Sequence, residues 1–169
     1  VTAIGDQAFG SCSSLTSIAL PHSVTNLGTL PFADCSRLTA ITVDALNPVY
    51  SSVAGVLIDD SKAALIQFPG AKAGSYTIPS SVTNIGEYAF LNCSNLTSLK
   101  IGNRLTSIGY RAFFSCSSLT GVFFEGNVPL NVGSEVFYNA NNAIIYYLPG
   151  TTGWSSTFAG RPTVLWNPQ

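Results

Sequence analysis

Apolar residues recur along the chain in two alternating patterns. The first is L-x-x-I-x-L, as at Leu15, Ile18 and Leu20, and its closing alternation predicts a short β-strand with one buried face. The second is V-T-x-I-G-x-x-A-F, as at residues 1–9. Its glycine suits a tight corner, and we expect its Ala-Phe pair to fill the space behind the strand. Each unit therefore predicts a strand, a corner and a return segment.

The whole unit repeats along the chain, with near-complete copies that begin at Val1, Val24, Val82 and Leu105. The aligned residues are the glycines Gly5, Gly28, Gly86, Gly109 and Gly133 and the phenylalanines Phe9, Phe32, Phe90, Phe113 and Phe137. A fixed period of about 23 residues is typical of a solenoid, in which each turn buries its core against the next. We expect the strands of successive turns to form one parallel sheet.

The period is interrupted once, between about residues 44 and 79. Residues 55–69 contain two apolar runs around a polar turn at residues 59–62, which predicts a β-hairpin. The regular register then resumes, because residues 78–82 (I-P-S-S-V) match residues 20–24 (L-P-H-S-V). We therefore expect a modified repeat, not a linker, whose hairpin adds strands at or beside the sheet.

The motif V-T-x-I-G-x-x-A-F-x-x-C-S-x-L-T resembles the BspA-type leucine-rich repeat family of bacterial surface proteins, over most of residues 1–147. The resemblance implies a leucine-rich-repeat solenoid with a parallel sheet on one face and short turns, helical or irregular return segments on the other. Residues 148–169 resemble the capping segment that ends such arrays. The family's known roles imply adhesion, host-protein binding and a secreted or cell-surface location. Two departures are the modified repeat and Ala140, which stands where other repeats have cysteine.

Charged side chains make up only 9% of the chain, against roughly 25% in typical soluble domains. The formal net charge is −1, and the lysines and arginines are not clustered. Because binding to a phosphate backbone needs several basic groups together, we expect no nucleic-acid partner. No apolar run approaches the roughly 18 residues that span a bilayer, so we expect no membrane insertion. The chain begins at Val1 without an initiating Met, which suggests a mature or excised piece of a longer protein.

The four cysteines occupy one repeat position, at Cys12, Cys35, Cys93 and Cys116. Cysteine is a good small buried residue, and alanine replaces it in the last repeat, so we favour free buried thiols. Two other interpretations stay open. Neighbouring thiols in such a ladder are close enough to suggest a disulfide, although parallel side chains are poor geometry for one. A metal site is disfavoured because no close C-x2-C pair is present.

The remaining chemistry does not assemble into a catalytic constellation. His22 is the sole histidine, and the sequence contains no G-x-S-x-G motif whose serine it could activate as a base. The carboxylates considered for acid–base work are Asp44, Asp59, Asp60, Glu87, Glu125 and Glu135. Asp59 and Asp60 lie in the predicted hairpin turn, where a weak calcium site is an alternative to ordinary turn chemistry. We therefore predict a protein that is not an enzyme and needs no cofactor.

Candidate ligand contacts lie on the outward face of the predicted sheet. Alternation along the strands places Lys100, Phe123 and Tyr147 there, in the C-terminal half of the array. The outward residues of the N-terminal half are small. Exposed aromatic rings are enriched where proteins bind proteins, and rings also suit sugar faces. The alternative is that these rings cover the last turn as part of the cap. Trp154 and Trp166 are assigned to the core of the cap.

Two functions of different classes follow. The first is a non-catalytic adhesion module that binds a protein or glycan ligand, including a host or matrix protein, on its solenoid surface. The second is a structural protein that self-assembles head to tail through open repeat edges, since exposed edges pair with other chains and a low charge does little to oppose association. The mass in solution distinguishes the two.

Overall fold

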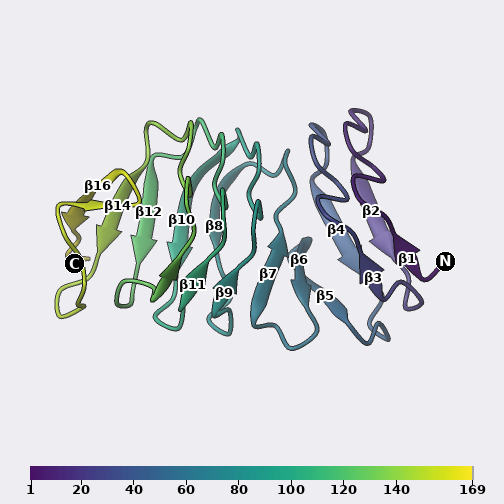
Figure 1. Cartoon of the computed structure of the whole chain (residues 1–169), viewed down its shortest axis with the longest axis horizontal. Coiled ribbons are helices and arrows are strands. Elements are labelled where there is room, and N and C mark those ends of the chain that lie inside the picture. Colours follow the sequence, from purple (N-terminus) through teal and green to yellow (C-terminus); the bar gives the residue numbers. More distant parts are fainter. Residues whose placement is uncertain (169) are drawn as a thin grey trace.

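The computed structural model describes residues 1–168, and it is a stack of strand-and-return turns with the two termini at opposite ends (Figure 1). Within these residues every regular element is a β-strand, and no α-helix forms. The predicted leucine-rich-repeat solenoid is therefore confirmed. Its return segments consist of turns and very short strands instead of helices.

One face of the solenoid carries parallel strands, as the L-x-x-I-x-L pattern predicts. In the first two turns β2 (Ser17–Leu20) pairs with β4 (Ala40–Val43). In the later turns the parallel strands are β8 (Gly74–Thr77), β10 (Leu96–Ile101), β12 (Gly121–Phe124), β14 (Ile144–Tyr147) and β16 (Arg161–Leu165), and β15 (Thr157–Phe158) closes the edge antiparallel to β16. We call this side the strand face. Its inward column, Leu99, Val122 and Ile145, is fully buried.

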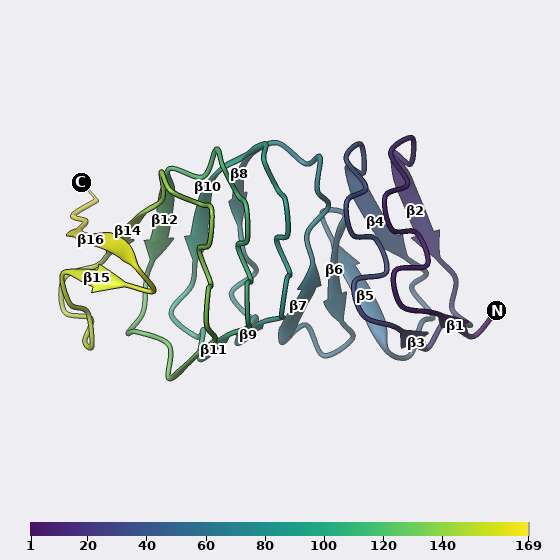
Figure 2. The same ribbon diagram turned by 45° about the horizontal axis from the view of Figure 1, so that its top comes forward.

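The opposite side, the return side, also pairs, which the sequence pattern had not indicated. Two-residue strands form at the V-T-x-I segments: β1 (Ala3–Ile4), β3 (Asn26–Leu27), β9 (Asn84–Ile85), β11 (Ser107–Ile108) and β13 (Asn131–Val132). β1 pairs with β3, and β9, β11 and β13 pair in order. Except at the modified repeat, both sides are hydrogen-bonded along the stack, so each regular turn is held to the next at two places (Figure 2).

The modified repeat supplies three strands to the middle of the stack: β5 (Tyr50–Val53), β6 (Val56–Asp59) and β7 (Ala64–Gln67). β6 pairs antiparallel with both β5 and β7, so the predicted hairpin is confirmed. β7 then joins the return side by pairing in parallel with β9. The added strands therefore lie between β4 and β8 and interrupt the strand face (Figure 1).

Strand β6 divides the hydrophobic core into two clusters. Val56, Leu57 and Ile58 are each 0% exposed, which is typical of a strand buried on both faces. Leu57 packs with Leu38 and Ile41 in the cluster of the first two turns. Val56 and Ile58 point the other way and join the larger cluster of the later turns.

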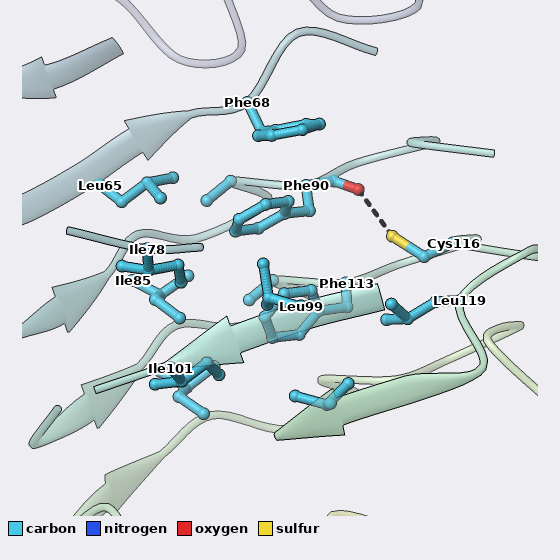
Figure 3. Close-up of a cluster of buried hydrophobic side chains, with 14 of the residues drawn as sticks. Leu65, Phe68, Ile78, Ile85, Phe90, Leu99, Ile101, Phe113, Cys116 and Leu119 are labelled. Carbon is cyan, nitrogen blue, oxygen red and sulfur yellow. Dashed lines mark hydrogen bonds between the residues drawn. The ribbon is translucent and has the colours of Figure 1, made fainter. Parts of the chain in front are cut away.

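The repeated phenylalanines form a stacked ladder inside the later turns (Figure 3). Ring centroids are 4.9 Å apart for Phe90 and Phe113 and 5.0 Å apart for Phe113 and Phe137. The modified repeat contributes Phe68, whose ring lies 4.9 Å from that of Phe90. In the first turns Phe9 stacks on Phe32 at 5.6 Å. A repeat without the A-F motif thus still supplies a ladder residue.

Three of the four cysteines, Cys35, Cys93 and Cys116, share one geometric role. The Sγ of Cys116 donates to the backbone oxygen of Phe90, one turn earlier, at 3.0 Å (Figure 3). Cys35 makes the same bond to Phe9 at 3.0 Å, and Cys93 makes a longer one to Phe68 at 3.9 Å. Burial raises the pKa of the Cys35 thiol, which keeps it protonated and able to donate. A small side chain with one weak donor fits this position.

Cys12 departs from the predicted set of buried thiols, because it is exposed whereas Cys35, Cys93 and Cys116 are buried. It lies in the first turn, so no earlier turn within the described chain covers it or offers a phenylalanine carbonyl. All four thiols are free, and no group of three or more His, Cys, Asp or Glu side chains in residues 1–168 is arranged to hold a metal ion.

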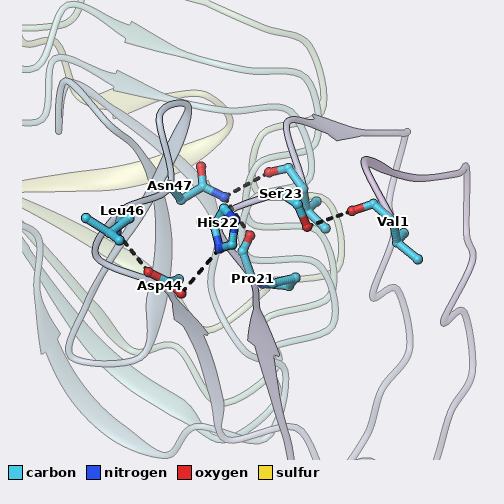
Figure 4. A network of polar contacts seen from close by, with 8 residues as sticks. Val1, Pro21, His22, Ser23, Asp44, Leu46 and Asn47 are labelled. Atoms are coloured by element: carbon cyan, nitrogen blue, oxygen red, sulfur yellow. Dashed lines mark hydrogen bonds and ion pairs between the residues drawn. The ribbon is translucent and has the colours of Figure 1, made fainter.

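A buried asparagine joins the modified repeat to the second turn. Asn47 is 4% exposed, and its Nδ2 donates to the backbone oxygens of Pro21 and Val24 at 3.0 and 2.8 Å (Figure 4). Its Oδ1 accepts from the backbone N–H groups of Val49 and Tyr50 at 2.9 and 2.8 Å. Every polar group of this side chain is thus engaged, as burial requires.

Candidate functional site

The site is built on the outward positions of the three strands β10, β12 and β14. The register pairs Lys100 with Phe123, and Phe123 with Tyr146, so these three side chains form one row on the strand face. A second row, one alternation earlier, consists of Ser98, Gly121 and Ile144. Lys100 and Phe123 therefore lie side by side, as the alternation of the sequence predicts.

The third predicted residue, Tyr147, requires a correction. Its register partner is Phe124, an inward residue, and its ring stacks on Trp154 in the cap at 5.3 Å with an interplanar angle of 12°. The reason is a one-residue contraction before the strand. Phe113 and Phe137 are 24 residues apart, but Val122 pairs with Ile145, 23 residues on. Tyr146 therefore takes the outward place that the 24-residue spacing assigned to Tyr147.

The two outward rings are held in a fixed arrangement. Phe123 and Tyr146 stack nearly parallel, with centroids 4.7 Å apart and an interplanar angle of 10°. A Cβ at Gly121 would come 2.7 Å from the Phe123 ring, so the ring lies directly over this glycine. Any larger residue at position 121 would force the ring away. Offset stacking of this kind adds about 0.5–1.5 kcal/mol beyond burial of area.

Beside the rings lies a shallow depression of about 400 Å³. Gly121 and Ile144 lie among its lining residues, together with the hydroxyls of Ser98 and Thr120 and the carboxamide of Asn142. The combination of two flat rings with a few hydrogen-bonding groups is typical of a recognition surface for a polar ligand.

One ion pair borders this surface. The Nζ of Lys100 lies 2.8 Å from Oε1 of Glu125, and both side chains are partly exposed. Such exposed pairs contribute little to stability, usually 0–1 kcal/mol. Their effect here is positional, because the ammonium group is held beside the aromatic row and still carries donors that face solvent.

The tail contacts this surface from the C-terminal side. Trp166 packs edge-on against Phe123 with centroids 5.0 Å apart, and its backbone N–H donates to the oxygen of Tyr147 at 2.8 Å. Trp166 therefore borders the aromatic row. Trp154 lies elsewhere, against Phe124 at 4.9 Å and Phe158 at 5.4 Å, among the aromatic residues that cover the last turn.

The other candidate chemistry stays dispersed. His22 and Asp44 are exposed, with Nδ1 and Oδ2 3.9 Å apart (Figure 4). Asp59 is used locally in the hairpin, where Oδ1 accepts from the backbone N–H of Ala64 at 2.6 Å and Oδ2 accepts from the Ser61 hydroxyl. Within residues 1–168 no helix is long and apolar enough to cross a membrane.

Sequence reasoning missed an aromatic cluster on the return side. The Arg111 guanidinium lies 4.9 Å from the Tyr110 ring centre and 5.0 Å from that of Phe114. Phe114 stacks on Tyr138 at 5.3 Å, and Arg111 pairs with Glu135 at 2.6 Å. The signal was available, because Phe114 and Tyr138 each follow a ladder phenylalanine in the sequence.

Comparison with known proteins identifies the repeat. Residues 1–52 and 66–158 match the BspA type leucine-rich repeat region, in six copies. The chain belongs to the BspA type leucine-rich repeat family. The internal gap in the match, residues 53–65, covers the end of β5 and most of the β6–β7 hairpin, where the period of this BspA type chain breaks. A search of curated protein sequences gave no match.

Solved structures of bacterial proteins share the fold. A leucine-rich repeat protein from Eubacterium ventriosum is 27% identical with a TM-score of 0.76, over 89% of this chain and 41% of the other. A leucine rich cell surface protein from Faecalibacterium prausnitzii is 27% identical with a TM-score of 0.67, over 90% and 46%. The pneumococcal vaccine antigen PcpA, 23% identical with a TM-score of 0.70 over 87% and 42%, shares the fold. The chain spans less than half the length of these proteins.

Proposed function

We propose that this chain is a non-catalytic binding module of a secreted or cell-surface protein, and that it captures a protein or glycan ligand on its strand face. The observation that carries the proposal is the row of Lys100, Phe123 and Tyr146 beside the depression over Gly121. Solenoids of this kind offer extended binding surfaces.

Three features of the row suit binding. The parallel rings of Phe123 and Tyr146 are preordered by stacking, so little conformational entropy is lost when a ligand covers them. Phe123 is fixed further by Gly121 beneath and Trp166 at its edge. Lys100, paired with Glu125, adds a charged group at the border. Membership of the family and the cell surface protein among the structural relatives support the proposed surface location.

The test is a binding screen of the wild-type chain against purified matrix proteins and a glycan array, with the double variant Phe123→Ser/Tyr146→Ser. We expect the double variant to lose at least about tenfold in affinity, since aromatic anchors at binding sites are worth more than 1.4 kcal/mol. Tyr138→Ser is the matched control, because Tyr138 is 51% exposed but lies on the return side. Equal binding by the double variant, or no binding by the wild type, would contradict the proposal.

A second candidate function is head-to-tail assembly. The backbone oxygens of Asp6, Ala8 and Gly10 in the first turn have no partner within residues 1–168, and neither do the N–H groups of Glu135 and Phe137 in the last. These two edges are complementary, and a contact of this kind that does not close produces a filament. Light scattering tests it: growth of the mass above 17.7 kDa with concentration would support assembly, and a constant monomer would refute it.

A further inference from the structure

Within residues 1–168 the return side contains one place where no backbone-to-backbone hydrogen bond joins the return segments of two successive turns. In the regular seams three backbone N–H groups of one turn donate to oxygens of the next. Between turns one and two the donors are Gln7, Phe9 and Ser11, at 2.8–3.0 Å, and between later turns they are Tyr88, Phe90, Asn92, Arg111, Phe113 and Ser115. The same parallel pairing thus recurs at every regular seam.

The second turn lacks these partners. The equivalent donors are the N–H groups of Leu30, Phe32 and Asp34, and none of them donates to a group within residues 1–168. The cause is the modified repeat. Only two residues separate Leu65 from its ladder residue Phe68, whereas four separate Ile85 from Phe90, so the corner that would accept these bonds is missing.

The missing corner leaves a groove, which we call the seam groove. Its walls are residues 27–36 of the second turn and residues 87–94 of the fourth, and Gln67 lines both of its hollows, which measure about 140 and 270 Å³. On the far wall the backbone oxygen of Glu87 has no partner among the described residues. A hydrogen bond of 2.5 Å from Asn92 Nδ2 to Asp34 Oδ1 crosses the groove at one end.

The aromatic ladder is interrupted at the same place. Phe32 stacks on Phe9, and Phe68 stacks on Phe90, but Phe32 and Phe68 do not stack on each other within the described chain. Both rings instead line the smaller hollow. An aromatic side chain that entered from outside would find a ring on each side.

We propose that the seam groove binds a polypeptide segment that carries an aromatic residue, and that the segment docks as an added return segment between the second and fourth turns. Backbone donors at every second residue of one wall match backbone oxygens at every second residue of a return segment, so the peptide would be held by main-chain hydrogen bonds as in other cases of backbone pairing at an open edge. In every regular seam of this protein a return segment built of turns, with left-handed backbone at residues such as Tyr88 and Arg111, occupies that place. The proposal is independent of the strand face, since the two surfaces share no residue.

The probe is the chain's own return segment from the fifth turn, residues 108–115 (I-G-Y-R-A-F-F-S), as an acetylated and amidated peptide. In the folded protein the oxygens of Tyr110, Ala112 and Phe114 accept this set of bonds from the preceding turn. Its arginine also suits Glu87, which lines the larger hollow and makes no ion pair within residues 1–168.

The experiment measures amide hydrogen exchange of the full chain, residue by residue, with and without peptide. At saturation we expect the Leu30, Phe32 and Asp34 amides to exchange at least about tenfold more slowly, because they become hydrogen-bonded. Two control peptides are used. The first has the same composition in scrambled order, and the second carries the Phe113→Ser change. We expect both to bind at least about tenfold more weakly, since each loses the aromatic anchor in register.

Three results would overturn the proposal: unchanged exchange at these amides up to the solubility limit of the peptide, protection that appears on β10, β12 and β14 instead, or equal binding by the scrambled peptide. A variant of the protein gives a further check. Gln67→Trp fills the groove between the hollows and should abolish the protection. The unliganded exchange pattern of the other turns shows whether that variant is folded.

Discussion

Replacing Asn47 by alanine removes four hydrogen bonds from one buried position. The side chain bridges the corner of the second turn, at Pro21 and Val24, and the start of the modified repeat, at Val49 and Tyr50. Each such bond contributes about 0.5–1.5 kcal/mol net, and groups left unpaired in the interior cost more. We therefore expect the free energy of unfolding to fall by about 3–4 kcal/mol, a large fraction of the roughly 5–15 kcal/mol of a typical domain.

The assay is urea unfolding at fixed temperature, followed by far-ultraviolet circular dichroism, for the wild type, Asn47→Ala and two comparison variants. Asn47→Asp keeps the acceptor for Val49 and Tyr50 but sets a buried carboxylate oxygen against the backbone oxygens of Pro21 and Val24, so it should be no more stable than Asn47→Ala. Asn26→Ala changes an exposed asparagine on β3 and should cost less than about 0.5 kcal/mol. A loss below about 1 kcal/mol for Asn47→Ala would refute the reasoning that this side chain joins the two parts of the stack.

Three further predictions concern the interior. A thiol reagent should modify one cysteine per native chain and four after unfolding, and Cys12→Ala should leave none reactive in the native state, because only Cys12 is exposed. Tyr76 has a buried hydroxyl that finds no hydrogen-bond partner among residues 1–168, and burial raises its pKa from 10.0 to about 12. The unfolded chain ionises first, so stability measured by urea unfolding should fall between pH 10 and 12, and Tyr76→Phe should reduce that fall without loss at pH 7. Phe113→Ala should lower the free energy of unfolding by about 3–5 kcal/mol, and Phe9→Ala by less than half as much, because Phe9 is only partly buried; equal losses in calorimetry would contradict the ladder.

Much of the fold could be predicted because the same side chains recur at each turn. A phenylalanine, a cysteine and an alternating apolar triplet, repeated in order, define which residues face the core. The hairpin was predictable for a similar reason, since two apolar runs around Asp59 and Asp60 leave few other arrangements. These are properties of single residues and of their spacing.

The strand-face site was predicted only in part, because its register depends on one residue of chain length. Lys100 and Phe123 follow from alternation within their own strands. The outward residue of β14 depends on the number of residues between Ala143 and the inward residue Ile145. The one-residue contraction there places Tyr146 instead of Tyr147 beside Phe123. A shift by one residue always moves a side chain to the other face of a strand, so a small change in a turn alters the site.

The return-side pairing and the seam groove could not be predicted from the sequence. Both depend on backbone hydrogen bonds, and residue identity does not report where a backbone N–H finds its partner. Leu30, Phe32 and Asp34 look like ordinary members of their repeat. Within residues 1–168 their N–H groups lack partners because the following turn, in which Phe68 takes the place of Phe32 after 36 residues, is built differently.

The measurement that tests the central claim most directly is amide chemical-shift mapping of the isotopically labelled chain with the tightest ligand from the binding screen. The account predicts that the perturbed amides cluster on β10, β12 and β14, around Lys100, Phe123 and Tyr146, with Trp166 at the border. The map would contradict it if the perturbed amides lay on the return side, or if the strand face were unchanged at saturation.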